Sequence, residues 1–180
     1  MNIEILGTGN HNKGAEMMLL TILENINLED VNFIYSPAIK NDQYPFYSKL
    51  CIYPKLSIPF KGFTFHSIFN IVPRKIRIPF GLIVDKEIDV VLDASGFAYS
   101  DQWGILPSLN AAINTKKWKA SGKKVILLPQ AFGPFRNLLI RNAVKSIINN
   151  SDLIFARDDD SFNYLKDLSS TANIKKSPDF

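Results

Sequence analysis

The sequence predicts an α/β fold of the Rossmann-like kind, in which a mainly parallel sheet lies between two layers of helices. Short apolar runs typical of buried strands alternate with segments whose apolar residues recur at helical spacing. The chain has 180 residues, of which 46% are hydrophobic and 21% charged, so it is long and apolar enough to bury a core. We therefore expect a three-layer sandwich formed by a single domain over residues 1–180.

Each expected element rests on a local pattern. The strands are short apolar or β-branched runs at residues 3–7, 31–36, 89–94, 124–129 and 153–156, with a last short strand at 173–175. The helices have apolar residues three or four positions apart and are predicted at residues 14–25, 106–120, 137–149 and 158–168. The helix at 137–149 is expected to bury a face made of Leu139, Ile140, Ala143, Val144, Ile147 and Ile148.

A stretch at about residues 37–86 interrupts this alternation. Six of the ten prolines fall between residues 37 and 79, and aromatic residues recur through the same stretch. It is too long for an ordinary connection between a strand and a helix. We expect an irregular insertion with a short helix near residues 66–71, whose aromatic side chains pack on the edge of the sheet. The alternative is that its apolar and basic part, residues 60–84, contacts a membrane surface or a partner.

The net charge of +4 is unevenly distributed along the chain. Between Lys40 and Lys86 there are eight basic residues and two acidic ones, which indicates either an anionic ligand nearby or a solvated basic face. The basic residues form no repeated motif, so we do not expect nucleic-acid binding. One cysteine and two histidines argue against a disulfide framework within the chain and against a metal site, and no cofactor is expected.

The sequence shows no sign of export or of a membrane span. No apolar run reaches the length of a transmembrane helix, and the N-terminus lacks the basic start and long apolar stretch of a signal peptide. A cytoplasmic location is therefore expected.

Ligands of open parallel sheets bind at the carboxyl ends of the strands, so the residues after each predicted strand are the first candidates for a site. After the first strand, a glycine-rich loop with Asn12, Gly14 and Glu16 opens a helix whose free backbone N–H groups suit an anion. Its spacing matches neither the dinucleotide fingerprint nor the P-loop. The alternative is a tight turn followed by a helix that Asn10 or Asn12 caps.

The loop after residues 89–94 holds Asp93, Gly96, Ser100 and Asp101 in a dense polar run. Carboxylates and hydroxyls at the end of a buried strand suit binding or acid–base chemistry. The competing interpretation is turn formation, because Asp, Ser and Gly all favour turns. We take Asp101 as the candidate for proton transfer.

Two later strands are also followed by candidate residues. Gln130 is the polar group of a loop made rigid by two prolines and a glycine. Arg157 follows the strand at 153–156 and suits an anion, unless it forms a structural ion pair instead. Asp158 and the two aspartates after it are expected to begin a helix, where negative charge is favourable, and Ser161 lies in that first turn.

Taken together, these stretches resemble the polysaccharide pyruvyl transferase family. Five stretches carry the resemblance, in order and over nearly the whole chain. They are Asn12-Lys13-Gly14-Ala15-Glu16, Asp93-Ala94-Ser95-Gly96 with Ser100-Asp101, Pro129-Gln130-Ala131-Phe132-Gly133-Pro134-Phe135, Ala156-Arg157-Asp158 with Ser161, and Ser177-Pro178-Asp179-Phe180.

The resemblance implies one Rossmann-like lobe of a two-lobe architecture similar to the GT-B glycosyltransferases. It also implies transfer of a pyruvyl group from phosphoenolpyruvate to a sugar hydroxyl, as a ketal, in cell-surface polysaccharide synthesis. The acceptor would be a glycan or a lipid-linked sugar, and the inner face of the membrane would then be one place of reaction. The chain ends where the resemblance implies a linker, so a second lobe or a second copy of the chain is expected.

For this reaction, Asp101 and Arg157 are the candidate catalytic residues, Asp101 for proton transfer and Arg157 for binding the donor anion. His11 is the alternative for proton transfer. The expected substrate-binding residues are Asn12, Gly14, Glu16, Gly96, Ser100, Gln130 and Ser161, and no metal ligands are expected. Two other functions stay open, a GT-B-like glycosyltransferase that uses a nucleotide sugar and a binding lobe without catalysis.

Overall fold

The computed structural model describes residues 1–10, 12–26, 30–37, 44–60, 63–65, 67–170 and 172–178. Its seven-stranded sheet has the order β3-β2-β1-β6-β7-β8-β9, and the described strand pairs of this sheet are parallel. The predicted α/β, Rossmann-like fold class is therefore confirmed. The chain divides within β6 into two compact units, Met1–Val91 and Leu92–Phe180. Whether they act as one domain stays a prediction.

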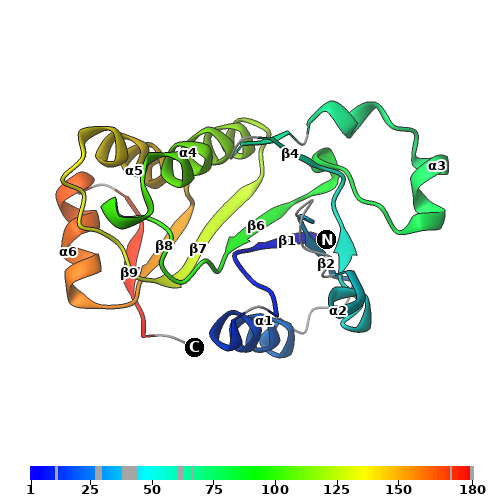
Figure 1. The fold of residues 1–180 in the computed structure, drawn as a ribbon, viewed down its shortest axis with the longest axis horizontal. Helices are drawn as coiled ribbons and strands as arrows, with labels where there is room; N and C mark the ends of the chain where they lie inside the picture. Colours follow the sequence, from blue (N-terminus) through cyan, green and yellow to red (C-terminus); the bar gives the residue numbers. More distant parts are fainter. Residues whose placement is uncertain are drawn as a thin grey trace. The chain divides into compact units, whose positions relative to one another are not determined.

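The first unit begins with two β–α steps. Its strands and helices are β1 (Asn2–Leu6), α1 (Lys13–Asn25), β2 (Asn32–Tyr35), α2 (Tyr44–Lys49) and β3 (Tyr53–Pro54) (Figure 1). The first two strands and the first helix agree with the prediction, and β2 pairs in parallel with both β1 and β3. Strand β3 was not predicted, because two residues are too few to show a strand pattern.

The predicted insertion, residues 37–86, contains α2 and β3, and the elements that follow β3 in it are all short. These are the antiparallel pair β4 (Ile58–Phe60) and β5 (Phe63–Phe65), the helix α3 (Arg74–Arg77), and 3₁₀ helices at Ser67–Ile71, Ile78–Phe80 and Asp85–Glu87. The 3₁₀ helix at Ser67–Ile71 lies where a short helix was expected; His66 lies outside the described residues. One insertion aromatic packs on the sheet as expected, since the Tyr47 ring stacks on Tyr35 of β2 at 4.0 Å between centroids.

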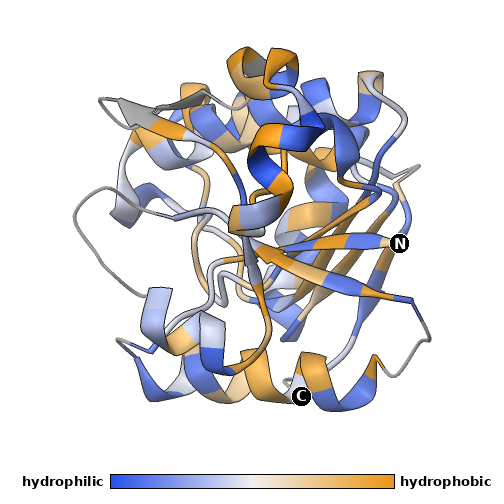
Figure 2. Ribbon diagram, turned by 90° about the vertical axis from the view of Figure 1, so that its right-hand side faces the viewer, coloured by the Kyte–Doolittle hydropathy of each residue, from blue (hydrophilic) through white to orange (hydrophobic). Residues whose placement is uncertain are grey.

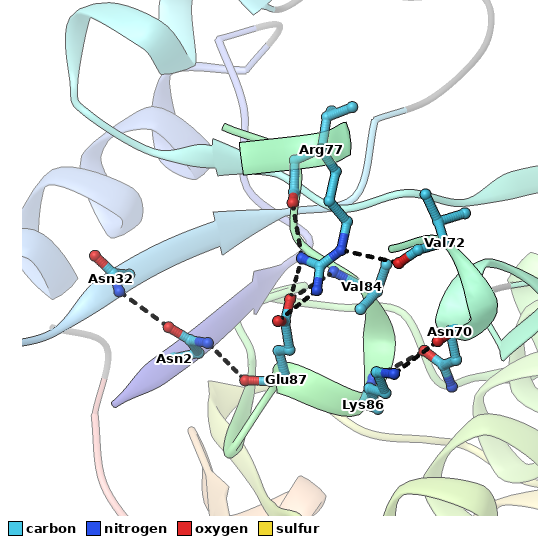
Figure 3. Close-up of polar contacts among 9 residues, drawn as sticks. Asn2, Asn32, Asn70, Val72, Arg77, Val84, Lys86 and Glu87 are labelled. Carbon is cyan, nitrogen blue, oxygen red and sulfur yellow. Dashed lines mark hydrogen bonds and ion pairs between the residues drawn. The ribbon is translucent and has the colours of Figure 1, made fainter. Parts of the chain in front are cut away.

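Two of the eight basic residues of the charged stretch are neutralised inside the first unit. Arg77, with a side chain only 4% exposed, donates to both carboxylate oxygens of Glu87 at 2.5 and 2.6 Å and to the carbonyl oxygens of Leu82 and Val72 (Figure 3). In the same figure the Glu87 carbonyl accepts a hydrogen bond from the Asn2 side chain at 2.6 Å. Arg77 therefore joins the insertion to the start of β1.

The second neutralised cation is Lys55, which is fully buried just after β3. Its Nζ lies 2.5 Å from Oε1 of Glu4 in β1 and 3.6 Å from Oδ1 of Asp85. Glu4 is also fully buried, and its Oε1 accepts a hydrogen bond from the Ser36 hydroxyl at 2.7 Å. This buried ion cluster was not predicted, because its members are up to 81 positions apart in sequence.

The Arg77–Glu87 pair makes the stability of the protein depend on pH. Burial raises the pKa of Glu87, but hydrogen bonds from Arg77 and Val84 and the charges of Arg77 and Arg74 outweigh it, so the pKa lies below 4.5. A lowered folded-state pKa stabilises the fold above the unfolded pKa, and this stabilisation is lost as the pH falls through the folded pKa. We expect Glu87→Gln to be less stable than the parent at neutral pH and the difference to shrink below pH 4.5. Chemical denaturation across this range measures it; a difference independent of pH would contradict the assignment.

The second unit continues the β–α alternation. Its elements are β6 (Val90–Asp93), α4 (Ile105–Ala120), β7 (Lys124–Gln130), α5 (Leu138–Asn150), β8 (Leu153–Ala156), α6 (Asp159–Leu168) and β9 (Ile174–Lys176), with a 3₁₀ helix at Asp101–Trp103. All of these strands and α-helices begin and end within two residues of the predicted ranges. In Figure 2 the strands include long hydrophobic segments, whereas the helices alternate between hydrophobic and hydrophilic residues, as one-sided burial requires.

Helix α5 shows where the apolar pattern was right and where it was wrong. Five residues of its predicted face are at most 6% exposed, namely Ile140, Ala143, Val144, Ile147 and Ile148. Leu139 is 61% exposed, so its assignment to the core was wrong. It lies at the margin of the apolar stripe and lines a surface groove with residues of α4. Helical spacing alone does not show whether a residue at this margin lies in the core or in such a groove.

Candidate functional site

The carboxyl ends of β6, β7 and β8 bring predicted residues of three different loops together. The carbonyl oxygen of Gly96, after β6, accepts a hydrogen bond from the backbone N–H of Ala131, after β7, at 2.8 Å. The carbonyl oxygen of Gln130 accepts one from the backbone N–H of Arg157, after β8, at 3.1 Å. Gly96, Gln130 and Arg157 thus lie along one edge of the second unit, as the sequence predicted from their positions after successive strands.

Ser161 is joined to the same edge, but by a structural contact. Its hydroxyl accepts a hydrogen bond from the backbone N–H of Phe132 at 2.8 Å, and the residue is only 2% exposed. Its own backbone N–H donates to Oδ1 of Asp158 at 2.8 Å, which caps α6. Ser161 therefore holds the loop after β7 against the start of α6, a contact that positions Gln130 and Arg157 indirectly.

Gln130 is the least satisfied polar side chain of this edge. The residue is fully buried, and neither atom of its side-chain amide has a hydrogen-bond partner among the residues that the structure describes. A buried amide without partners costs free energy, so native proteins rarely keep one without a function. It is the last residue of β7, and the binding role that the sequence suggested for it stays a prediction.

Replacing Gln130 by methionine tests whether its amide has a structural role. Because the substitution removes an unpartnered amide and keeps the volume similar, we expect the free energy of unfolding to stay unchanged or to rise by about 1–3 kcal/mol. Chemical denaturation measures this change. A clear loss of stability would show that the amide makes a structural hydrogen bond instead.

The loop after β6 is organised by Asp93 and Tyr99. The Asp93 carboxylate accepts hydrogen bonds from the backbone N–H and hydroxyl of Ser95 and from the Tyr99 hydroxyl. Burial, the Asp93 charge and the hydrogen bond to Asp93 together raise the pKa of Tyr99 well above 10.0. Tyr99 therefore stays neutral and donates to Asp93. The sequence singled out Asp93 but assigned no role to Tyr99, because only the turn of the loop brings the two together.

Ser100 and Asp101 both have structural contacts in this loop. Ser100 is 1% exposed, and its hydroxyl accepts from the backbone N–H of Gln102 at 3.3 Å. The Asp101 carboxylate accepts from the backbone N–H groups of Arg136 at 2.7 Å and Asn137 at 3.2 Å, so it anchors the chain just before α5. The catalytic role that the sequence suggested for Asp101 stays a prediction, and the structure adds this anchoring role beside it.

Gly133 allows the loop after β7 to pack closely. Its backbone N–H donates to the carbonyl oxygen of Tyr99 at 2.9 Å, and its φ of +83° is one that glycine adopts readily. A Cβ at this position would come within 2.5 Å of the Tyr164 ring. The peptide bond to Pro134 is cis. The glycine that the sequence associated with a rigid loop is thus required both by backbone conformation and by a close approach.

Arg157 contributes a positive charge to this edge. Its side chain is 38% exposed, and its Nε lies 4.0 Å from Oδ2 of Asp158. Burial raises the pKa of Asp158, but hydrogen bonds from Ser161 and the charges of Arg157 and Lys176 lower it overall. Asp158 is therefore an ionised helix cap, as the sequence predicted for the start of this helix.

The predicted residues of the first unit form the start of α1. The Asn12 side chain caps the helix by accepting from the Gly14 backbone N–H at 2.8 Å, which was one of the two alternatives for this loop. The Glu16 carboxylate pairs with Lys13 at 2.7 Å. Binding roles for Asn12, Gly14 and Glu16 stay predictions. His11 and the last two residues of the C-terminal motif, Asp179 and Phe180, lie outside the described residues.

The geometry of the second unit suits an anionic ligand that also forms hydrogen bonds. A partly exposed arginine side chain and a buried amide lie at the carboxyl edge of parallel strands, which is the usual ligand-binding edge of such sheets. Among the described residues, no three His, Cys, Asp or Glu side chains are grouped so that they could hold a metal ion. The fold defines a Rossmann-like α/β protein, and a small-anion site at this edge stays a prediction.

Comparison with family models identifies the family to which the protein belongs. The family model for polysaccharide pyruvyl transferases matches residues 12–180, which include every predicted site residue. The chain belongs to the polysaccharide pyruvyl transferase family, as its motifs suggested, and the family is one of transferases. The comparison with curated proteins gave no match. In the described part of the chain, every helix is too short or too polar to span a lipid bilayer.

Proposed function

We propose that this protein takes part in the transfer of a pyruvyl group from phosphoenolpyruvate to a sugar in cell-surface polysaccharide synthesis. The observation that carries the proposal is the position of Arg157 within the segment that matches the family. Its side chain, 38% exposed, follows β8 at the carboxyl edge of the sheet, and its backbone N–H donates to the carbonyl oxygen of Gln130. Phosphoenolpyruvate carries a phosphate and a carboxylate, and a guanidinium can bind either through two parallel hydrogen bonds.

The proposed reaction defines what the site must supply. Two sugar hydroxyls each form a C–O bond to C2 of phosphoenolpyruvate, and the C–O bond to phosphate breaks. The proton lost by one hydroxyl is matched by the proton that the methylene carbon gains as it becomes a methyl group. The proton of the other hydroxyl leaves with the phosphate. The site therefore needs a cation for the donor and a group that transfers protons.

The residues take the following roles in this proposal. Arg157 binds the donor anion, Asp101 transfers a proton, and Asn12, Gly14, Glu16, Gly96, Ser100, Gln130 and Ser161 form or support the substrate-binding surface. The acceptor is a glycan or a lipid-linked sugar, which places the reaction at the inner face of the membrane in the second case. A second lobe of a GT-B-like architecture, or a second copy of the chain, completes the site.

Asp101 has two separable roles, and Asp101→Asn tests which one dominates. If Asp101 transfers a proton, turnover per folded molecule falls, because an amide cannot accept the proton. If it only anchors the chain before α5, the melting temperature falls while turnover per folded molecule stays unchanged. Both quantities are measured on the same preparation. The second result would assign proton transfer to another residue.

A direct assay tests the proposed function as a whole. The protein is incubated with phosphoenolpyruvate and a panel of sugars and lipid-linked sugars, and released phosphate is measured together with the mass of the product. We expect phosphate release that depends on the sugar, and a product whose mass rises by one pyruvate less one water. Binding of a nucleotide sugar in place of phosphoenolpyruvate would instead support a GT-B-like glycosyltransferase.

A further inference from the structure

A groove between α4 and α5 forms an apolar surface outside the candidate site. It has a volume of about 360 Å³ and is lined mainly by apolar side chains, among them Ile105, Leu109 and Ile113 of α4 and Leu139 and Ala143 of α5. Because both helices follow parallel strands of the same unit, their N-terminal ends lie at the carboxyl ends of the strands, where the candidate site is. The groove therefore begins close to that site.

Large apolar side chains around this groove are exposed to solvent. Leu106 is 54% exposed, Leu138 71% and Leu139 61%, and Trp103, just before α4, is 51% exposed. Scattered exposed leucines are ordinary, but a cluster on two adjacent helices marks a surface that binds a partner. We call Trp103, Leu106, Leu109, Ile113, Leu138 and Leu139 the apolar patch.

The same two helices carry positive charge only. Helix α4 contains Lys116, Lys117 and Lys119, helix α5 contains Arg141 and Lys145, and neither helix contains an acidic residue. The one acidic partner described for these side chains is Asp152, which lies 2.7 Å from Lys119 and belongs to the loop after α5. Lys116 also lines the groove. Apolar side chains and cations on the same pair of helices are the combination that binds the surface of an anionic lipid bilayer.

We propose that the face formed by α4 and α5 docks the protein on an anionic lipid bilayer, with the apolar patch in the interfacial region and the cations on the headgroups. A second copy of the chain fits this face less well, because a two-fold interface would bring Lys116, Lys117, Arg141 and Lys145 of one copy near the same residues of the other. This proposal extends the proposed function. The docking itself does not depend on that function; only the further point, that a lipid-linked acceptor would meet the site at the membrane surface, rests on it.

Vesicle binding tests this surface without any need for turnover. The full chain is mixed with vesicles of phosphatidylcholine and phosphatidylglycerol, or of phosphatidylcholine alone, and bound protein is separated by flotation. We expect binding to the anionic vesicles only, with weaker binding at higher salt. The double variant Leu138→Glu/Leu139→Glu should bind at least about tenfold less. Acidic residues are favourable in the first turn of a helix, so this variant should keep its fold.

Charge variants and a matched control sharpen the test. Arg141→Glu/Lys145→Glu should lower the affinity for anionic vesicles by about fivefold or more for each charge. Met17→Glu changes a side chain that is 67% exposed on α1, and it should bind like the parent. Circular dichroism confirms folding of each variant.

Several outcomes would overturn the proposal. Unchanged vesicle binding by both double variants would show that this face does not dock on lipid. Ile76 is an insertion residue that is 61% exposed. If Ile76→Glu lost vesicle binding while the α4–α5 variants kept it, the membrane contact would lie in the insertion. Conversion of a dimer to a monomer by Leu138→Glu/Leu139→Glu, with vesicle binding unchanged, would identify the face as an interface between copies. Absence of phosphoenolpyruvate turnover would contradict only the proposed reaction.

Discussion

Replacing Lys55 by methionine is expected to lower the free energy of unfolding by about 3–5 kcal/mol, the usual cost of removing one partner of a buried ion pair. The Lys55 side chain is fully buried, and its Nζ lies 2.5 Å from the carboxylate of the equally buried Glu4. Without the ammonium group, Glu4 must either keep an uncompensated charge in the interior or take up a proton. The hydrogen bond from Ser36 compensates only part of this cost.

A double-mutant cycle isolates the interaction between the two charges. Glu4→Gln keeps an acceptor for the Ser36 hydroxyl and removes the charge, so Lys55→Met/Glu4→Gln should be more stable than the sum of the two single losses implies. Lys75→Met, an exposed lysine of α3, serves as control and should change stability by less than about 0.5 kcal/mol. Urea denaturation measures the parent, the two single variants, the double variant and the control. Additive losses would mean that the two groups do not interact.

Replacing Arg157 by lysine is expected to weaken phosphoenolpyruvate binding by about 10- to 150-fold, which corresponds to a loss of about 1.5–3 kcal/mol for a charged hydrogen bond. Lysine keeps the charge but cannot form the two parallel hydrogen bonds that a guanidinium makes to a phosphate or carboxylate. Replacement by alanine should abolish most of the remaining affinity. Isothermal titration with phosphoenolpyruvate measures both variants.

The structural alternative for Arg157 is an ion pair that braces the start of α6. Its Nε lies 4.0 Å from Oδ2 of Asp158, and a pair that is more than a third exposed contributes little to stability. We therefore expect the melting temperature of the lysine variant to stay close to that of the parent. Arg141→Lys, a change of the same kind on the exposed surface of α5, controls for nonspecific charge effects. A large fall in melting temperature with donor affinity intact would assign Arg157 to the scaffold.

Much of the sheet could be predicted because its strands are locally distinctive. Val90–Asp93, Lys124–Gln130 and Leu153–Ala156 are apolar or β-branched runs, and burial on both faces imposes that composition wherever the strand lies in the sheet. Strand β3 could not be predicted, since Tyr53 and Pro54 have no periodicity and become a strand only by pairing with β2. Leu139 was expected in the core for a related reason: the helical pattern does not show whether a neighbouring element covers the margin of the apolar stripe.

The sequence predicted where the candidate site lies, but it did not predict all the contacts that its residues make. Gly96, Gln130 and Arg157 follow successive strands, and the parallel arrangement brings the ends of those strands to one edge. The contacts of Ser161 with Phe132 and of Asp101 with the chain before α5 link positions 29 and 35 apart, so no local pattern could reveal them. The same holds for the hydrogen bond between Tyr99 and Asp93, which depends on how the loop turns.

The sequence by itself determined the α/β fold class, most element boundaries and the family, because burial patterns and short motifs are local properties. Only the tertiary structure decided which side chains meet. It buried Lys55 against Glu4, gave the hydroxyls of Ser100 and Ser161 hydrogen-bond partners within the loops, and left the amide of Gln130 buried without a described partner. The reason is physical: hydrogen bonds and ion pairs depend on distances of about 3 Å between groups that the folded chain brings together from far apart in sequence.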